Sequence, residues 1–236
     1  MKIKKNEILI IGSEGSIGSA LQKKLLKKKL DPVCIDFKKI NKKNYFSAQL
    51  KSLNQISKLF NKIFQKYPNI KILVNCSGYI HSELSFNFLK NKIHNEKKLR
   101  KIFNENLIVP YFSSVLFAKN LYLKKLSGLI INFSSTNSKG IIGQAAYSAS
   151  KKGIETLTKV WANEFSNTDI RFCCIAPGYI DLKSTKNKTP VNQIKKIIDK
   201  NPIQRLGKAD ELIKAIFFII ENDYFNGKTL FLDGGQ

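Results

Sequence analysis

Tyr147 and Lys151 lie four residues apart in the stretch NFSSTNSKGIIGQAAYSASKKG, which spans residues 132–153. On a helix these two side chains share one face, one turn apart. A phenol with a pKa of about 10 is a poor base at neutral pH. A lysine cation about 4 Å away, at an effective dielectric constant of about 20, contributes about 4 kcal/mol, which lowers that pKa by about three. The pair therefore predicts an acid/base tyrosine tuned by its neighbour. For an isolated motif the alternative is a solvated pair on a helix surface.

A glycine-rich loop near the start of the chain predicts a dinucleotide site. Gly12, Gly15 and Gly18 follow an apolar run and open an amphipathic segment. Such a tight turn needs residues without a Cβ, and the start of a helix offers N–H groups to a pyrophosphate. A plain glycine turn is the alternative.

The end of the next apolar run bears on which dinucleotide is bound. Asp36 lies about twenty residues after the loop, where a carboxylate accepts hydrogen bonds from the adenosine ribose. Asp36 and Glu14 both repel a 2′-phosphate, which favours NAD. Lys38 and Lys39 keep NADP as the second option.

Six short apolar runs alternate with longer segments of helical spacing. The runs are residues 7–11, 32–36, 70–75, 128–134, 169–177 and 228–233. This alternation predicts an α/β fold with a doubly wound, mostly parallel sheet and helices on both faces. The length of 236 residues suits one domain over residues 1–236.

The formal net charge of +24 does not by itself indicate a nucleic-acid partner. Arginine, the better residue for bidentate phosphate contacts, occurs only three times, and no aromatic-basic motif accompanies the lysines. No membrane span or signal peptide is evident, so we expect a cytoplasmic protein that binds neither nucleic acid nor membrane. The four cysteines show no CxxC or metal-ligand spacing, so reduced cysteines and no metal are expected.

Seven motifs, in this order, resemble those of the short-chain dehydrogenase/reductase family, of the compact kind that includes 3-oxoacyl-(acyl-carrier-protein) reductases and sugar and polyol dehydrogenases. Besides the glycine loop they are ILVNCSG (72–78) with Asn106 after it, INFSS (131–135), YxxxK (147–151), IAPGYI (175–180), RLGKADEL (205–212) and DGG (233–235). The resemblance implies a Rossmann-type sheet of about seven strands. It also implies an NAD(P)-dependent oxidoreductase that forms a homotetramer or a dimer through helices at 95–126 and 145–166.

The resemblance implies four catalytic residues, Asn106, Ser135, Tyr147 and Lys151. Tyr147 transfers the proton of the substrate oxygen, a serine hydrogen-bonds that oxygen, and Lys151 holds the nicotinamide ribose. The main-chain carbonyl of Asn106 holds a relay water. Pro110 supports this role, because proline has no N–H to donate the helical hydrogen bond that this carbonyl would otherwise accept. A plain proline kink is the alternative.

Two serines compete for the catalytic role. Counting back from Tyr147 by the family's usual interval selects Ser134, whereas alignment on the strand end selects Ser135. Strand ends move less than loops change length, so we predict Ser135.

The expected cofactor-binding residues come from the loop and from the resemblance. They are Gly12, Ser13, Glu14, Ser16, Ile17, Asp36, Phe37, Gln49, Leu50, Asn75, Ser77, Gly78, Pro177, Gly178 and Ile180, together with Tyr147 and Lys151.

The chain also departs from the family pattern. The glycine spacing is GxxGxxG in place of GxxxGxG, Gln49 replaces an acid near the adenine, and Leu182 replaces a threonine for which Ser184 or Thr185 would substitute. These changes bear on cofactor affinity more than on reaction type.

We therefore expect an enzyme that interconverts a secondary alcohol and a ketone, with a sugar, polyol or surface-glycan precursor as substrate. The alternatives are an NADPH-linked 3-oxoacyl-(acyl-carrier-protein) reductase and a catalytically idle nucleotide-binding scaffold. Substrate contacts are expected from residues 79–84, from Ile141 and Ile142, and from residues 179–200.

Overall fold

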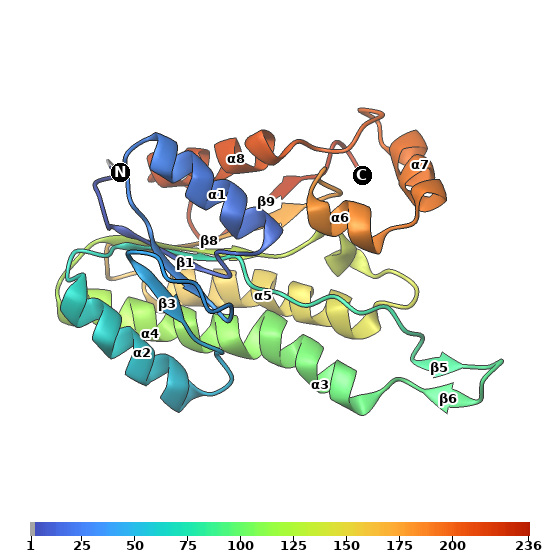
Figure 1. Cartoon of the computed structure of the whole chain (residues 1–236), viewed down its shortest axis with the longest axis horizontal. Helices are drawn as coiled ribbons and strands as arrows, with labels where there is room; N and C mark the ends of the chain where they lie inside the picture. Colours follow the sequence, from blue (N-terminus) through green and yellow to red (C-terminus); the bar gives the residue numbers. More distant parts are fainter. Residues whose placement is uncertain (1–2) are drawn as a thin grey trace.

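Seven parallel strands form one sheet in the order β3-β2-β1-β4-β7-β8-β9 (Figure 1). The computed structural model describes residues 3–236, apart from the side chains of Ser184 and Lys188. The strands are β1 (Ile8–Ile11), β2 (Val33–Asp36), β3 (Tyr45–Ser47), β4 (Ile72–Asn75), β7 (Gly128–Phe133), β8 (Ile170–Pro177) and β9 (Thr229–Leu232). From β1 the chain moves outward to β3 and then crosses back to β4, so the strand order reverses between β1 and β4. Ligands bind beyond the carboxyl ends of parallel strands at such a point. The predicted doubly wound α/β sheet is confirmed.

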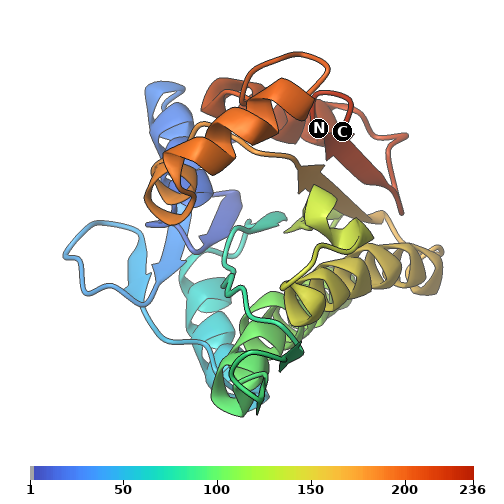
Figure 2. The same cartoon turned by 90° about the vertical axis from the view of Figure 1, so that its right-hand side faces the viewer.

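Helices cover both faces of this sheet, as the end-on view of Figure 2 shows. They are α1 (Ser16–Lys27), α2 (Leu53–Lys66), α3 (Glu96–Phe103), α4 (Val109–Leu123), α5 (Ala145–Glu164), α6 (Lys183–Lys188), α7 (Val191–Lys200) and α8 (Ala209–Glu221). Helices α1 and α8 pack on one face, and α2, α4 and α5 pack on the other (Figure 1). Within residues 3–236, none of the helices has the length and apolar character needed to cross a membrane.

The central strands are apolar at every position because both of their faces are covered. Leu9 and Ile11 of β1 belong to the core beneath α2, α4 and α5. Ile8 and Ile10 point the other way, into the core beneath α1 and α8. All four are fully buried, so β1 lies rigidly between two cores and holds the glycine loop that follows it.

The expected helix at 95–126 is not one continuous α-helix. It consists of α3, a π-helical turn, η1 (Asn104–Ile108), and α4. In the π turn the N–H of Val109 donates to the carbonyl of Asn104, five residues back. Pro110 lacks an N–H, so the α-helical ladder cannot continue normally at this point, and π turns of this kind are frequent at functional sites.

Two further elements were not expected from the sequence. The short edge strand β3 pairs with β2. Strands β5 (Phe86–Asn87) and β6 (Lys92–Ile93) form an antiparallel hairpin that projects beyond the start of α3 (Figure 1). Phe88 and Leu89 at its tip are 83% and 99% exposed, so no buried hydrophobic pattern marks this segment.

Candidate active site

Tyr147 and Lys151 occupy the first two turns of α5, and their side chains meet different surroundings. Lys151 is buried, and its Nζ donates a hydrogen bond of 2.8 Å to the carbonyl oxygen of Phe133 at the end of β7. The same Nζ lies 5.8 Å from the ring centroid of Tyr147. Burial lowers the pKa of Lys151 to about 8, because a charged ammonium loses hydration there.

The expected lowering of the tyrosine pKa by the lysine is not what the structure shows. Burial raises the pKa of Tyr147, and a hydrogen bond with Ser135 opposes this rise only in part. The reason is geometric, because Lys151 directs its ammonium at Phe133 and not at the phenol. Tyr147 is therefore a protonated acid at neutral pH.

The two candidate serines face opposite ways. Ser135 hydrogen-bonds the phenol of Tyr147 and accepts a bond of 3.2 Å from the N–H of Asn137. Ser134 is buried and donates to Oε1 of Glu155 at 2.7 Å and to the carbonyl of Lys151 at 3.1 Å. Only Ser135 lies beside the tyrosine, so the geometry favours it over Ser134 for the role at the substrate.

Asn106 lies in the π turn and is fully buried. Its Oδ1 accepts from the N–H of Tyr79 at 2.8 Å, and its Nδ2 donates to the carbonyl of the same residue at 2.7 Å. A Cβ on the neighbouring Gly78 would lie 3.0 Å from Oδ1 of Asn106 and 3.6 Å from Nζ of Lys151. Gly78 thus allows the loop after β4 to pass close to both side chains.

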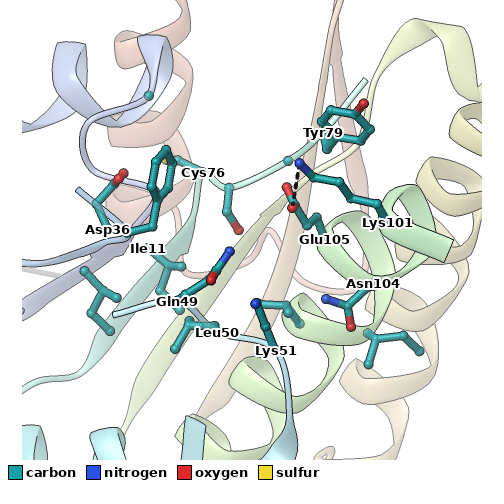
Figure 3. A pocket seen from close by; sticks show the side chains of 18 of the residues that line it. Ile11, Asp36, Gln49, Leu50, Lys51, Cys76, Tyr79, Lys101, Asn104 and Glu105 are labelled. Carbon is teal, nitrogen blue, oxygen red and sulfur yellow. Dashed lines mark ion pairs between the residues drawn. The ribbon is translucent and has the colours of Figure 1, made fainter. Parts of the chain in front are cut away.

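A cleft of about 1280 Å³ opens beside these residues, between the glycine loop, the ends of β2 and β4, and α3. Eight of the expected cofactor-binding residues line it, namely Gly12, Glu14, Asp36, Phe37, Gln49, Leu50, Ser77 and Gly78. Figure 3 shows Asp36, Gln49 and Cys76 around this cleft, with Tyr79 and Lys101 nearby. Its volume is ample for a small-molecule ligand.

The glycine loop is shaped by close backbone contacts. Gly12 has a φ of +76°, and a Cβ there would come within 2.7 Å of the N–H nitrogen of Ser77. A Cβ on Gly18 would collide with the carbonyl oxygen of Gly12. The first helix can therefore begin directly at the cleft, with Gly15 at its N-cap.

Asp36 is held rigidly at the edge of the cleft. Its Oδ2 accepts from the N–H of Glu14 at 3.0 Å, and its Oδ1 accepts from the N–H of Lys38 at 3.2 Å. A carboxylate offers about four acceptor positions, so about two remain for a ligand. The Oγ of Ser77, on the wall of the same cleft, is buried without a hydrogen-bond partner among the described residues. These groups fit a ribose and its neighbouring polar atoms.

Other expected residues do not line this cleft. They are Ser13, Ser16, Ile17, Asn75, Pro177, Gly178 and Ile180, together with Tyr147 and Lys151 of α5. Ile180 is buried and forms an isolated bridge with Gly207. Of the suggested substitutes for threonine at position 182, the side chain of Ser184 lies outside the described part of the chain.

The side chain of Asn75 belongs to a buried polar group behind the site. Its Nδ2 donates to Oδ1 of Asn132 at 2.6 Å and to Oγ of Ser114 at 3.2 Å. Its Oδ1 accepts from Oγ of Ser113 at 3.2 Å. The side chain is therefore committed to the core between β4, β7 and α4.

The cleft also has lining residues that the sequence did not reveal, and four of them lie on α3. Lys101 places its Nζ 4.3 Å from the ring centroid of Tyr79 and 3.7 Å from Oε1 of Glu105. The i,i+4 spacing of Lys101 and Glu105 was visible, but the sequence did not show that α3 and the π turn border the cleft.

Comparisons with known proteins identify the family. A family model described as enoyl-(acyl carrier protein) reductase matches residues 17–236. The 3-oxoacyl-(acyl-carrier-protein) reductase FabG of Thermotoga maritima is 32% identical over 189 residues, which cover 77% of this chain and 72% of that protein. The chain belongs to the short-chain dehydrogenase/reductase family. As a member of this family, it is an oxidoreductase acting on CH–OH groups.

Two further relatives of this short-chain dehydrogenase/reductase are a sugar-acid dehydrogenase and a second FabG. The 2-dehydro-3-deoxy-D-gluconate 5-dehydrogenase of Escherichia coli K12 is 32% identical over 193 residues, covering 80% of this chain and 74% of that protein. FabG of Buchnera aphidicola is 30% identical over 248 aligned positions, covering 100% and 99%. The family is thus clear, whereas the names of these three relatives point to different substrates.

Solved structures agree with the fold. ElxO with NADP bound has a TM-score of 0.86 at 24% identity, and the match covers 98% of each chain. 4-Hydroxyisoleucine dehydrogenase complexed with NADH has a TM-score of 0.84 at 24% identity, again over 98% of each chain.

Proposed function

We propose that this protein interconverts a secondary alcohol and a ketone with NAD(H), and that its substrate is a sugar, a polyol or a surface-glycan precursor. The observation that carries the proposal is the convergence of Tyr147, Ser135, Lys151 and Asn106 next to a cleft bordered by the glycine loop. An idle scaffold would have no need of a phenol, a hydroxyl and a buried ammonium placed together.

Bound NAD(H) supplies or accepts the hydride. In the direction of reduction, Tyr147 donates its proton to the ketone oxygen, and its raised pKa keeps it protonated for this step. Ser135 donates a hydrogen bond to the same oxygen and stabilises the charge that develops on it. Lys151 holds the nicotinamide ribose, and the carbonyl of Asn106, which cannot accept an N–H from Pro110, holds a relay water.

Asp36 supports NAD as the preferred cofactor. Its two backbone hydrogen bonds hold the carboxylate at the rim of the cleft. A 2′-phosphate at this position would be repelled, whereas ribose hydroxyls would donate to the free acceptor positions. Glu14 adds negative charge, and it is neutralised in part by Lys42 at 3.5 Å.

The cofactor assignment is tested by steady-state kinetics with NAD and NADP supplied separately. The parent is expected to prefer NAD, and Asp36→Asn is expected to lower the ratio of kcat/KM for NAD to that for NADP by about tenfold or more. Asp31→Asn, which removes an exposed carboxylate elsewhere, is the matched control. A parent that prefers NADP would refute the assignment. A Tyr147→Phe variant as fast as the parent would refute the proposed reaction.

A 3-oxoacyl-(acyl-carrier-protein) reductase is the second candidate. It is supported by the full-length similarity to FabG of Buchnera aphidicola. Turnover of an acetoacetyl thioester with NADPH, in preference to sugar and polyol substrates with NAD, would select this function.

A further inference from the structure

A second cavity, of about 460 Å³, lies under helix α7. It is lined by Tyr179, Gln193, Lys196, Ile197, Lys200 and Gln236. None of the residues of α7 is fully buried, so the helix covers the cavity without forming part of the core. Figure 1 shows α6 and α7 beside the C-terminus, at the carboxyl end of β9.

The end of α7 is fixed in place by Asn201. This residue is buried, its Nδ2 donates to the carbonyl of Asp233 at 3.1 Å, and its Oδ1 accepts from the N–H of Ile203 at 2.9 Å. These bonds tie the helix to the segment that follows β9. Lys200 immediately precedes the anchored residue, and Lys196 lies one turn earlier on the same face of the helix.

Two of the six residues that line the cavity, Lys196 and Lys200, carry positively charged side chains, whereas Asp199, the acidic residue between them on α7, does not line it. The main-chain oxygen of Gln236, which also lines the cavity, accepts a hydrogen bond of 2.9 Å from Nζ of Lys139. In the part of the chain that the structure describes, no ion pair joins either lysine to a carboxylate. Two lysine side chains that share one helix face beside a small cavity favour an anion as its ligand.

Tyr179 links this cavity to the catalytic residues. It lines the cavity and lies two residues beyond the end of β8, while Ser135 lies two residues beyond the end of the neighbouring parallel strand β7, so both lie at the same carboxyl edge of the sheet. A molecule whose carbonyl is at Tyr147 can therefore extend past Tyr179 toward α7.

We propose that the substrate is anionic, and that Lys196 and Lys200 bind its carboxylate or phosphate group while Tyr147 acts on a carbonyl elsewhere in the same molecule. This inference rests on the proposed oxidoreductase reaction and narrows its substrate class. In reduction the carbonyl carbon gains a hydride from NAD(P)H and the carbonyl oxygen gains the proton of Tyr147. The anionic group is bound but not changed.

Four probes with the same 3-oxo group test the proposal. Acetoacetate and its methyl ester differ in a carboxylate, and the acetoacetyl thioesters of 4′-phosphopantetheine and of pantetheine differ in a phosphate. The anionic member of at least one pair is expected to have the higher kcat/KM, and the pair that shows the difference identifies the source of the anion. Equal or lower kcat/KM for both anionic probes would overturn the proposal.

Lysine variants of α7 test whether this helix causes the preference for anionic substrates. Lys196→Met combined with Lys200→Met is expected to reduce the ratio of anionic to neutral kcat/KM by about tenfold for each lysine. Lys195→Met is the matched control, because Lys195 is on the same helix but does not line the cavity. A double variant that keeps the parent ratio would overturn the assignment. Tyr147→Phe tests the reaction separately, since it should slow turnover of every probe.

If the parent reduces none of the probes, a binding measurement tests whether Lys196 and Lys200 bind an anion. Acylation of lysines by an amine-reactive reagent is followed by mass spectrometry with added phosphate, acetate or chloride at equal ionic strength. Phosphate or acetate should protect Lys196 and Lys200 more than Lys195, and chloride should not. Equal protection of the three lysines would overturn the proposal.

Discussion

Replacing Lys151 by methionine is expected to stabilise the folded protein while removing its activity. Methionine is unbranched like lysine and one heavy atom shorter, and the substitution removes a buried charge. A fall of the lysine pKa from 10.5 to about 8 corresponds to a cost of about 3 kcal/mol at pH 7, at about 1.4 kcal/mol for each tenfold change in proton affinity. Loss of the hydrogen bond to Phe133 offsets about 1 kcal/mol of that gain. The net expected gain is about 2 kcal/mol, or about 4–8 °C in Tm for a chain of this size.

The pH dependence separates this cause from a simple packing effect. Between pH 8 and 10.5 the unfolded lysine is protonated and the folded lysine is not, so the stability of the parent rises with pH in this window. The advantage of the variant should therefore be full below pH 8 and should disappear toward pH 10.5. Urea unfolding of the parent, Lys151→Met and the exposed control Lys159→Met, at pH 7 and at pH 10, measures the difference. A variant that is no more stable at pH 7, or whose advantage is the same at both pH values, would refute the reasoning.

Two further predictions concern single side chains. Ser135→Ala should lower kcat about 100-fold, because it removes a donor to the reacting oxygen. Ser134→Ala should keep most of the activity and lose about 1 kcal/mol of stability, since Ser134 donates to the partly buried Glu155. Steady-state kinetics and urea unfolding of both variants check this. A large loss of kcat in Ser134→Ala, with little loss in Ser135→Ala, would transfer the catalytic role to Ser134. Arg171 donates to three main-chain carbonyls at the end of α8, so Arg171→Met should cost about 2–4 kcal/mol, whereas the exposed Arg100→Met should cost less than about 0.5 kcal/mol. Equal unfolding midpoints for the two arginine variants would contradict this assignment.

The main elements were predictable because their signals are local. Six of the seven sheet strands are apolar runs bounded by polar residues, and the glycine spacing marks the turn into α1. The edge strand β3 has only three residues, none of them fully buried, so it carries no strong apolar pattern. The β5–β6 hairpin is exposed and equally unmarked.

The site was predictable in its residue types but less so in its electrostatics. Spacing alone places Tyr147 and Lys151 on one face of α5, yet it says nothing of the carbonyl of Phe133, which comes from a strand and captures the ammonium. Burial, which raises the pKa of Tyr147, is likewise a property of the assembled fold. Whether a lysine charge lowers the pKa of Tyr147 or burial raises it could not be decided before the tertiary contacts were known.

The buried amides behind the site also determine how the central strands are aligned. Asn75 of β4 and Asn132 of β7 are direct partners in the parallel pairing, and their side chains are hydrogen-bonded to each other. A slip of one residue would place Asn75 opposite Ile131 or Phe133, whose side chains cannot pair with an amide, and leave it unpaired in the core. This pair therefore specifies one alignment against its neighbours, and with it the relative height of the two loops that carry Ser77 and Ser135.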